Sequence, residues 1–183
     1  RSVWHSETAV VNTHGAAKML LSQKAGAQCK TVFSGEGADE LLWGYHFFRH
    51  LKNEESGNLK TGDRNISLLK GSMGGKLLHY EEVSQMFGAY PYLMMRHFYM
   101  NKIRNRILSG RFAESARIDA WDWKTEIFKH IPQALMKGLT SPELSELFLL
   151  KCDFPSYILN YLGERQEVSM GVEGRTPFLD HHL

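Results

Sequence analysis

The sequence contains few cysteines, and they follow no pattern that would make them structural. Only two occur in 183 residues, Cys29 and Cys152, and they lie far apart without a C-x-x-C pair. Small disulfide-stapled proteins and structural zinc sites both need denser cysteine patterns. The spacing therefore argues against a secreted, disulfide-stapled fold or a zinc finger, and it favours a cytoplasmic location.

The sequence also lacks a charge excess and a long apolar run. Its formal net charge is only +2, which is too small to make nucleic acid or an anionic membrane the main partner. No run of about eighteen apolar residues and no basic-then-apolar leader occurs, so we expect neither a membrane span nor a signal peptide. With 43% apolar and 23% charged residues, the composition is that of a globular domain with a core.

The first 51 residues predict a helix, a strand, a tight loop and a second helix. Residues 14–25 place alanines and leucines at helical spacing, which would leave Lys18 on the solvent side. Residues 29–33 are β-prone, and apolar residues from 41 to 48 return to helical periods. This alternation is typical of α/β proteins, in which parallel strands carry ligand-binding loops at their carboxyl ends.

One strand cannot form a sheet by itself, so we expect its partner strands upstream of Arg1. The chain begins without methionine and stops just after an apolar P-F-L run, which indicates that it is cut at both ends. Residues 52–80 hold several glycines among mixed charges and predict a loop or mobile excursion. The whole chain, residues 1–183, is therefore expected to be one partial domain.

Residues 81–183 predict a mainly helical part. Apolar stripes indicate helices over about 92–107 and 122–137. Ser141-Pro142-Glu143 is typical of a helix start, because it combines a side-chain cap, a proline in the first turn and an acid near the positive end of the helix dipole. Pro155 is expected to interrupt that run and to start another helix that ends at Gly163.

The loop from Ser34 to Glu40 carries the residues best suited to chemistry. Two glycines around Glu36 let the backbone turn sharply, and the N–H groups that open the next helix would face an anion in the bend. Asp39 and Glu40 offer the oxygen ligands that Mg²⁺ prefers beside a phosphate. The alternative is an ordinary strand-to-helix turn, since the lysine of a Walker loop is absent. Spacing alone leaves both readings open.

Two motifs resemble the asparagine synthase family. The string T-V-F-S-G-E-G-A-D-E-L-L-W-G-Y at residues 31–45 closely resembles that family's V-V-L-S-G-E-G-A-D-E-L-F-G-G-Y. Far downstream, Glu164-Arg165 and G-V-E-G-R-T-P-F-L-D-H at residues 171–181 are similar to its D-R and G-V-E-G-R-V-P-F-L-D-H. A weaker match, His5, Glu7 and Asn12, resembles H-x-E-P and P-N in some members. Two specific motifs in the right order make chance resemblance improbable.

The resemblance implies a fold and a reaction. The fold would be an α/β, adenine-nucleotide-α-hydrolase-like (ATP-pyrophosphatase) domain, present here as a partial parallel sheet with a mainly helical C-terminal part. The reaction would be ATP-dependent amidation of aspartate through an acyl-adenylate, releasing AMP and pyrophosphate, with ammonia from glutamine. ATP and Mg²⁺ would be the cofactors, and a homodimer is one assembly that this leaves open.

The resemblance also implies roles for residues of the loop. Glu36 corresponds to the family glutamate that takes a proton from the attacking ammonia. Ser34, Gly35 and Gly37 would contact ATP or pyrophosphate, and Asp39 would hold Mg²⁺. Such a general base typically contributes about 10² to 10⁴ in rate.

The chain departs from the family pattern in several places. The S-G-G-x-D-S phosphate loop, the glutaminase domain and the lysine downstream of P-F-L-D are absent, so we expect residues 1–183 alone neither to adenylate nor to amidate. V-N-T-H at residues 11–14 replaces the bacterial T-T-x-R, which calls aspartate recognition into question and keeps a different carboxylate acceptor open. Trp43 occupies a position where the family often has glycine. A degenerate, noncatalytic nucleotide-binding or interaction module is the other alternative.

Five charged residues near the motifs are assigned structural or substrate-side roles. For the two arginines we favour a structural role, in which they pair with buried acids such as Glu173 and Asp180. The five residues are Glu40, Arg165, Glu173, Arg175 and Asp180.

Two further patterns have simple explanations. His46 and His50 are spaced i, i+4 without a third ligand, which favours ordinary histidines over a zinc site. The basic, aromatic segment from Arg96 to Arg111 could bind RNA, but the small net charge favours a helix with one solvated basic face.

Overall fold

A computed structural model describes residues 1–8, 10, 12–56, 80–93, 107, 110, 111 and 123–182. They belong to two compact units. Unit 1 comprises Arg1–Tyr45 and Leu149–Leu183, and unit 2 comprises His46–Phe148. Unit 1 is therefore built from the two ends of the chain, whereas unit 2 is one continuous segment.

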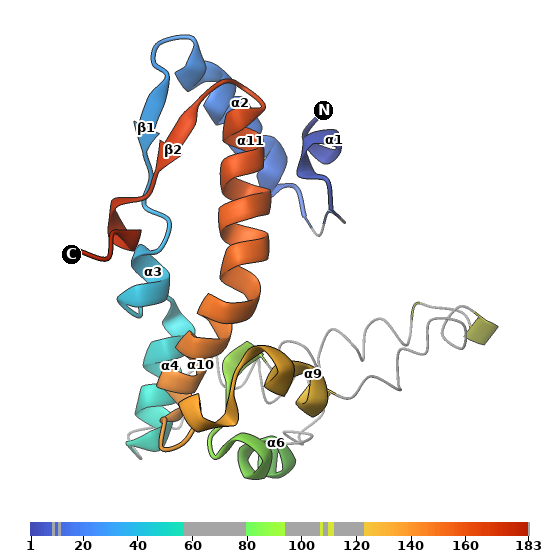
Figure 1. Cartoon of the computed structure of the whole chain (residues 1–183), viewed down its shortest axis with the longest axis vertical. Coiled ribbons are helices and arrows are strands. Elements are labelled where there is room, and N and C mark those ends of the chain that lie inside the picture. The colour runs from blue at the N-terminus through green and yellow to red at the C-terminus, as the bar shows by residue number, and fades with distance from the viewer. Residues whose placement is uncertain are drawn as a thin grey trace. The chain divides into compact units, whose positions relative to one another are not determined.

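Unit 1 contains a two-stranded parallel sheet. Strand β1 (Thr31–Phe33) pairs with β2 (Glu173–Arg175), with Val32 opposite Gly174, and Figure 1 shows the two strands side by side. The β-branched and aromatic residues of β1 suit an extended conformation. The expected partner for β1 lay upstream of Arg1, but the described partner comes from the downstream motif. A strand of three residues that includes glycine has too little apolar periodicity to be predicted from sequence.

Helix α2 (His14–Gly26) forms as expected, but it packs through a different face. Its buried residues are Gly15, Met19 and Ser22, whereas Leu20 and Leu21 are 67% and 64% exposed. A Cβ at Gly15 would lie 3.0 Å from the Tyr161 hydroxyl, so the helix approaches its neighbour through small side chains. The expectation of a leucine-lined core face was wrong, because close approach at small residues decides the orientation of this helix.

The helical run expected over residues 41–48 is broken. Helix α3 (Ala38–Leu41) ends just before Trp43, which adopts a left-handed conformation with φ 55°. The Gly44 N–H donates to the Asp39 carbonyl at 3.0 Å, and these features together form a Schellman-type helix end. Trp43 thus holds the left-handed position that glycine usually takes at the end of a helix.

Unit 2 contains α4 (His46–Glu55), α6 (Tyr80–Phe87), α9 (Trp123–His130), the 3₁₀ turn η2 (Gln133–Leu135) and α10 (Ser141–Phe148). Its core is apolar, and the rings of Phe87 and Phe148 meet edge to face with centroids 5.2 Å apart. The core residues are Phe87, Tyr90, Ile127, Ile131, Met136, Leu144 and Phe148.

The start of α10 is confirmed at Ser141. The Glu143 carboxylate accepts hydrogen bonds from the Thr140 N–H at 2.8 Å and the Thr140 hydroxyl at 2.7 Å. These bonds lower the pKa of Glu143. Helix α9 stops at His130, earlier than the expected 137, because the residue before Pro132 disfavours helical geometry.

Two expectations fall largely outside the described residues: the loop over 52–80 and the helix over 92–107. Within the first range, residues 52–55 belong to α4 and Tyr80 begins α6. Residues 57–79 and 94–106 are outside the part that the structure describes.

The second half of unit 1 is helical. A π-helical segment, η3 (Leu149–Glu164), leads into α11 (Arg165–Val168), and the 3₁₀ turn η4 (Pro177–Leu179) follows β2. Pro155 lies inside η3 and does not interrupt it, contrary to expectation. The described residues therefore form a mainly helical structure with a small parallel sheet, compatible with an α/β fold. No helix among them has the length and apolar character needed to cross a bilayer.

Candidate functional site

The loop that follows β1 is held against the C-terminal motif. The Ser34 N–H donates to the Arg175 carbonyl at 2.8 Å, which continues the β1–β2 pairing into the loop. Gly37 has φ 97°, and a Cβ there would overlap the Leu179 side chain. The two motifs, distant in sequence, are thus brought into direct contact, and the close approach at residue 37 requires glycine.

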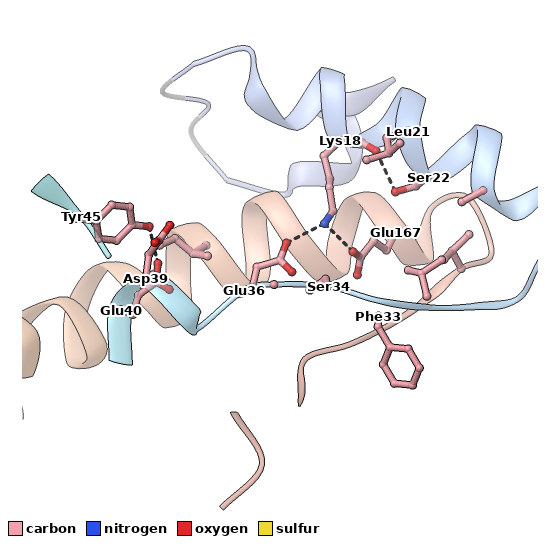
Figure 2. Close-up of a pocket in the computed structure, with 15 residues that line it drawn as sticks. Lys18, Leu21, Ser22, Phe33, Ser34, Glu36, Asp39, Glu40, Tyr45 and Glu167 are labelled. Carbon is pink, nitrogen blue, oxygen red and sulfur yellow. Dashed lines mark hydrogen bonds and ion pairs between the residues drawn. The ribbon is translucent and has the colours of Figure 1, made fainter. Parts of the chain in front are cut away.

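A cavity of about 540 Å³ opens beside this loop, entirely within unit 1. Its walls come from α2, β1, the loop, η3 and α11, and Figure 2 shows the side chains around it. Five of the sequence-predicted site residues line it: Ser34, Gly35, Glu36, Asp39 and Glu40.

A lysine and two glutamates form the charged centre of the cavity. The Lys18 Nζ lies 2.7 Å from Glu36 Oε1 and 2.8 Å from Glu167 Oε1, and Figure 2 shows Lys18 reaching from α2 to both carboxylates. Burial lowers the pKa of Lys18, but its hydrogen bonds to Glu167 and Glu36 outweigh burial and raise that pKa above 10.5. Lys18 is therefore a charged group inside the site and not a solvent-facing residue as expected.

Two buried oxygens at the cavity have no protein partner. Ser34 Oγ and Glu36 Oε2 are inaccessible to solvent and make no hydrogen bond within the described structure. Buried polar atoms are almost always satisfied in folded proteins, so such atoms beside a cavity are those that a bound molecule would satisfy. Glu36 thus has one oxygen held by Lys18 and one left as an acceptor.

Glu40 is occupied in holding the loop. Its residue is 2% exposed, and its carboxylate accepts the Gly37 N–H at 3.0 Å and the Tyr45 hydroxyl at 2.5 Å. Burial and the bond to Glu40 raise the pKa of Tyr45 well above its ordinary value. Both Glu40 oxygens are therefore used within the fold, which fits the structural role considered for it.

Asp39 is the acid whose position suits a metal ion. It is exposed at the start of α3 and lines the same cavity as the two partnerless oxygens. A carboxylate with solvent access beside a cavity is the kind of ligand that Mg²⁺ takes, together with water and phosphate oxygens. The residues present therefore fit the metal that the sequence implies.

The charged residues of the C-terminal motif lie apart from this centre. Arg175 contacts Glu173 at 2.9 Å, but both side chains are more than half exposed, so the expected buried bridge is a surface pair. Asp180 accepts the His182 N–H at 2.9 Å. Arg165 donates to the Ser6 carbonyl and lies 3.6 Å from Glu7, which fits a structural role in tying α11 to the N-terminal segment.

A second, smaller cavity of about 280 Å³ adjoins the loop within unit 1. Glu36 and Glu167 border both cavities, and Glu164, Glu173 and Gly174 border only the second. Carboxylates therefore dominate the charge on this side, and Lys18 contacts two of them, Glu36 and Glu167, from the first cavity.

Three possible metal ligands come close together in one exposed group of the described structure. Among the described residues, Asp180, His181 and His182 are the ones whose ligand atoms come close enough together, and all three are exposed neighbours in sequence. His46 and His50 do not belong to that group.

Sequence reasoning missed Lys18 and Glu167. The available signal for Lys18 was its position on the same helical face as Gly15 and Ser22, which are buried. Glu167 follows the Glu164-Arg165 match by two residues and is itself 6% exposed. Neither position belongs to the motifs that drew attention to the loop.

Comparisons with known proteins agree with the two motifs. Residues 1–183 match the family model for asparagine synthase. Amidase chyE of Penicillium rubens is 27% identical over 202 residues, and Amidase chry2 of Gibberella zeae is 26% identical over 204. Each alignment covers the whole chain but only 29% of the relative. No solved structure matches the chain. The chain belongs to the asparagine synthase family.

Proposed function

We propose that the protein containing this chain is an ATP-dependent ligase that converts a carboxylate into an amide. The observation that carries the proposal is the pair of buried, partnerless oxygens, Ser34 Oγ and Glu36 Oε2, on a glycine loop that lines a cavity. Membership of the asparagine synthase family supports the same reaction class. The finer fold that we propose is the ATP-pyrophosphatase α/β domain, of which β1 and β2 would be two strands.

The proposed reaction has two steps. A carboxylate oxygen of the substrate attacks the α-phosphorus of ATP, which forms an acyl-adenylate and expels pyrophosphate. The nitrogen of ammonia then attacks the acyl carbon, the bond to the adenylate oxygen breaks, and AMP leaves. Glu36 Oε2 takes the proton that the nitrogen loses, because Oε1 is already engaged by Lys18.

The loop residues have separate proposed roles. The Ser34 hydroxyl and the Gly35 backbone bind phosphate oxygens, and a glycine backbone permits the close approach that this needs. Gly37 supports this binding by shaping the loop, because its own N–H is donated to Glu40. Asp39 would hold Mg²⁺, which when bound neutralises phosphate charge. Among acceptors we propose aspartate first, with ammonia derived from glutamine.

A second candidate is supported by the names of the relatives. Both are amidases in name, so hydrolysis or formation of an amide other than asparagine is the competing assignment. ATP dependence separates ligation from hydrolysis, because ligation forms AMP and pyrophosphate whereas hydrolysis of an amide proceeds without ATP. The identity of the amide product separates asparagine formation from formation of another amide.

The experiment uses the full-length protein and its Glu36→Gln variant. Pyrophosphate release reports adenylation, and amide formation reports the second step. We expect the variant to keep pyrophosphate release and to lose amide formation by about 10² to 10⁴-fold, since it loses the general base. An equal fall in both steps would show that Glu36 is not that base, and ATP-independent release of ammonia by the native protein from an amide other than glutamine would favour the amidase.

A further inference from the structure

Lys18 is the one cationic side chain in contact with Glu36 in the described structure, and no motif accounts for it. It comes from α2, outside both stretches that resemble the family, and its ammonium bridges Glu36 and Glu167. A lysine gives up considerable side-chain entropy when it is fixed in one place. Two short contacts at a side chain that is only 20% exposed therefore require a surrounding structure that favours this geometry.

We propose that Lys18 is a positioning residue for Glu36, and that Glu167 anchors Lys18 from the other side. The inference rests on the proposed role of Glu36 as the group that accepts the proton from ammonia. Lys18 does not touch the reacting atoms in this scheme. It fixes one carboxylate oxygen so that the other is directed to the substrate.

The anchor is well placed to act independently of Glu36. Glu167 is buried in α11, and a Cβ at Gly174 of β2 would overlap its carboxylate, so that carboxylate has little room to move. Its contact places the Lys18 ammonium at a fixed point. The polar contact that the structure gives the Glu36 side chain is with the Lys18 ammonium, at 2.7 Å, so Glu36 takes its position from that ammonium.

The helix that carries Lys18 is also held near both ends. Gly15 approaches the Tyr161 ring, and a Cβ at Gly26 would lie 2.9 Å from the Met170 carbonyl and 3.0 Å from Val172. The backbone at Lys18 is thus fixed to η3 and to the segment before β2. The position of Glu36 is consequently set by elements from both ends of the chain.

Charge explains why one lysine serves two acids. Without Lys18, the Glu36 and Glu167 carboxylates would face each other in a partly buried space with no intervening cation, and like charges repel strongly there. The Glu36 carboxylate would then swing away or bind a proton, and either change would remove the acceptor oxygen from its place.

The test compares Lys18→Met, Lys18→Arg and Lys24→Met in the full-length protein. Lys24 is an exposed lysine of the same helix and serves as the matched control. We expect Lys18→Met to slow amide formation by about 10²-fold, the cost of a small misplacement of a reacting group. Pyrophosphate release should persist, Lys18→Arg should restore most of the amide formation, and Lys24→Met should resemble the native protein.

A lysine that only stabilises the fold gives a different result. Lys18→Met would then depress both half-reactions equally or leave both unchanged, and either outcome overturns the inference. Failure of Lys18→Arg to recover more amide formation than Lys18→Met also overturns it, because arginine keeps the charge and the hydrogen-bond donors.

A double-mutant cycle with Glu36→Gln separates this inference from the proposed function. If Lys18 acts through Glu36, Lys18→Met adds no further loss of amide formation to Glu36→Gln, and the denaturation midpoints of the ligand-free proteins are non-additive. If Glu36→Gln proves fully active while those midpoints remain coupled, the proposed role of Glu36 as the base fails and the contact stands. Additive midpoints, or a further loss of activity in the double variant, overturn the role of Lys18.

Discussion

The conformation of the loop requires a residue without a side chain at Gly37. We expect Gly37→Ala to lower the free energy of unfolding by about 2–4 kcal/mol, because φ 97° disfavours any Cβ and the added methyl would overlap Leu179. Gly35→Ala is the control, since a Cβ at Gly35 meets nothing within 4 Å. Chemical denaturation of both variants checks this, and equal losses would contradict the described contact.

Tyr45 should make the protein sensitive to alkali. Burial and the Glu40 bond raise its pKa above the ordinary 10.0, so the folded state keeps the phenolic proton that the unfolded state gives up. The stabilisation is fully present below pH 10.0 and is lost as pH rises from there toward the folded pKa. Lys18 adds to the same trend, because its pKa is also raised above 10.5.

The measurement compares stability against pH in the native protein and Tyr45→Phe. We expect the native protein to lose stability more steeply above about pH 10, the ordinary pKa of a phenol, because the variant has no proton to lose at this position. The variant should be less stable at neutral pH, since one oxygen of the buried Glu40 carboxylate loses its donor. Parallel curves above that pH would refute the assignment.

At the residue scale, the loop could be located from sequence and its charged neighbours could not. Ser34, Glu36 and Asp39 lie in one contiguous motif, and the structure brings them to one cavity. Lys18 and Glu167 reach Glu36 only after α2 and α11 have packed. The orientation of α2 depends on how its small residues pack against residues that are distant in sequence. The spacing of apolar residues does not predict that packing.

Helix α10 is the element whose start the sequence predicts best. Two of its serines also bind it to the neighbouring segment by hydrogen bonds. Ser145 is 1% exposed, and its hydroxyl accepts the Tyr92 N–H at 2.9 Å while donating to the Ser141 carbonyl. The Ser141 hydroxyl accepts the Tyr90 N–H at 3.2 Å. The helix therefore satisfies backbone groups of the segment that follows α6.

We expect Ser145→Ala to cost about 1–3 kcal/mol of unfolding free energy, since it leaves the Tyr92 N–H without this acceptor in the core of unit 2. Ser156→Ala is the matched control, because that exposed hydroxyl bonds only the carbonyl one helical turn before it. Thermal melts of both variants test the difference, and an equal effect would argue that the Ser145 bond contributes little.

Other elements could not be predicted because their causes are non-local. Strand β2 exists through its pairing with β1 and has no apolar alternation of its own. Pro155 was expected to end a helix, yet η3 continues through it. By contrast, neighbouring residues determine where α9 ends, before Pro132, and where α10 begins. Sequence can therefore predict both boundaries.

At the scale of the whole molecule, unit 1 depends on the C-terminal segment for its core. Val172 is 2% exposed and packs near Gly26, whereas Val168 is 62% exposed. We expect Val172→Ala to lower stability by about 2 kcal/mol and Val168→Ala to change it by less than about 0.5 kcal/mol. Equal effects in equilibrium denaturation would mean that this segment is not part of the folded unit.

The pairing of the two chain ends has a consequence for how the protein is made. The Ser2 hydroxyl donates to the side-chain amide oxygen of Gln166 across a separation of 164 residues, and β1 likewise pairs with a strand from the far end of the sequence. Such contacts form only after a long loop has closed, and the entropy cost of closing that loop slows folding. Unit 2 is one continuous segment of the chain, so its core contacts do not have to wait for the C-terminal segment. The loop from Ser34 to Glu40 therefore reaches its described conformation only after residues 173–179 have been synthesised.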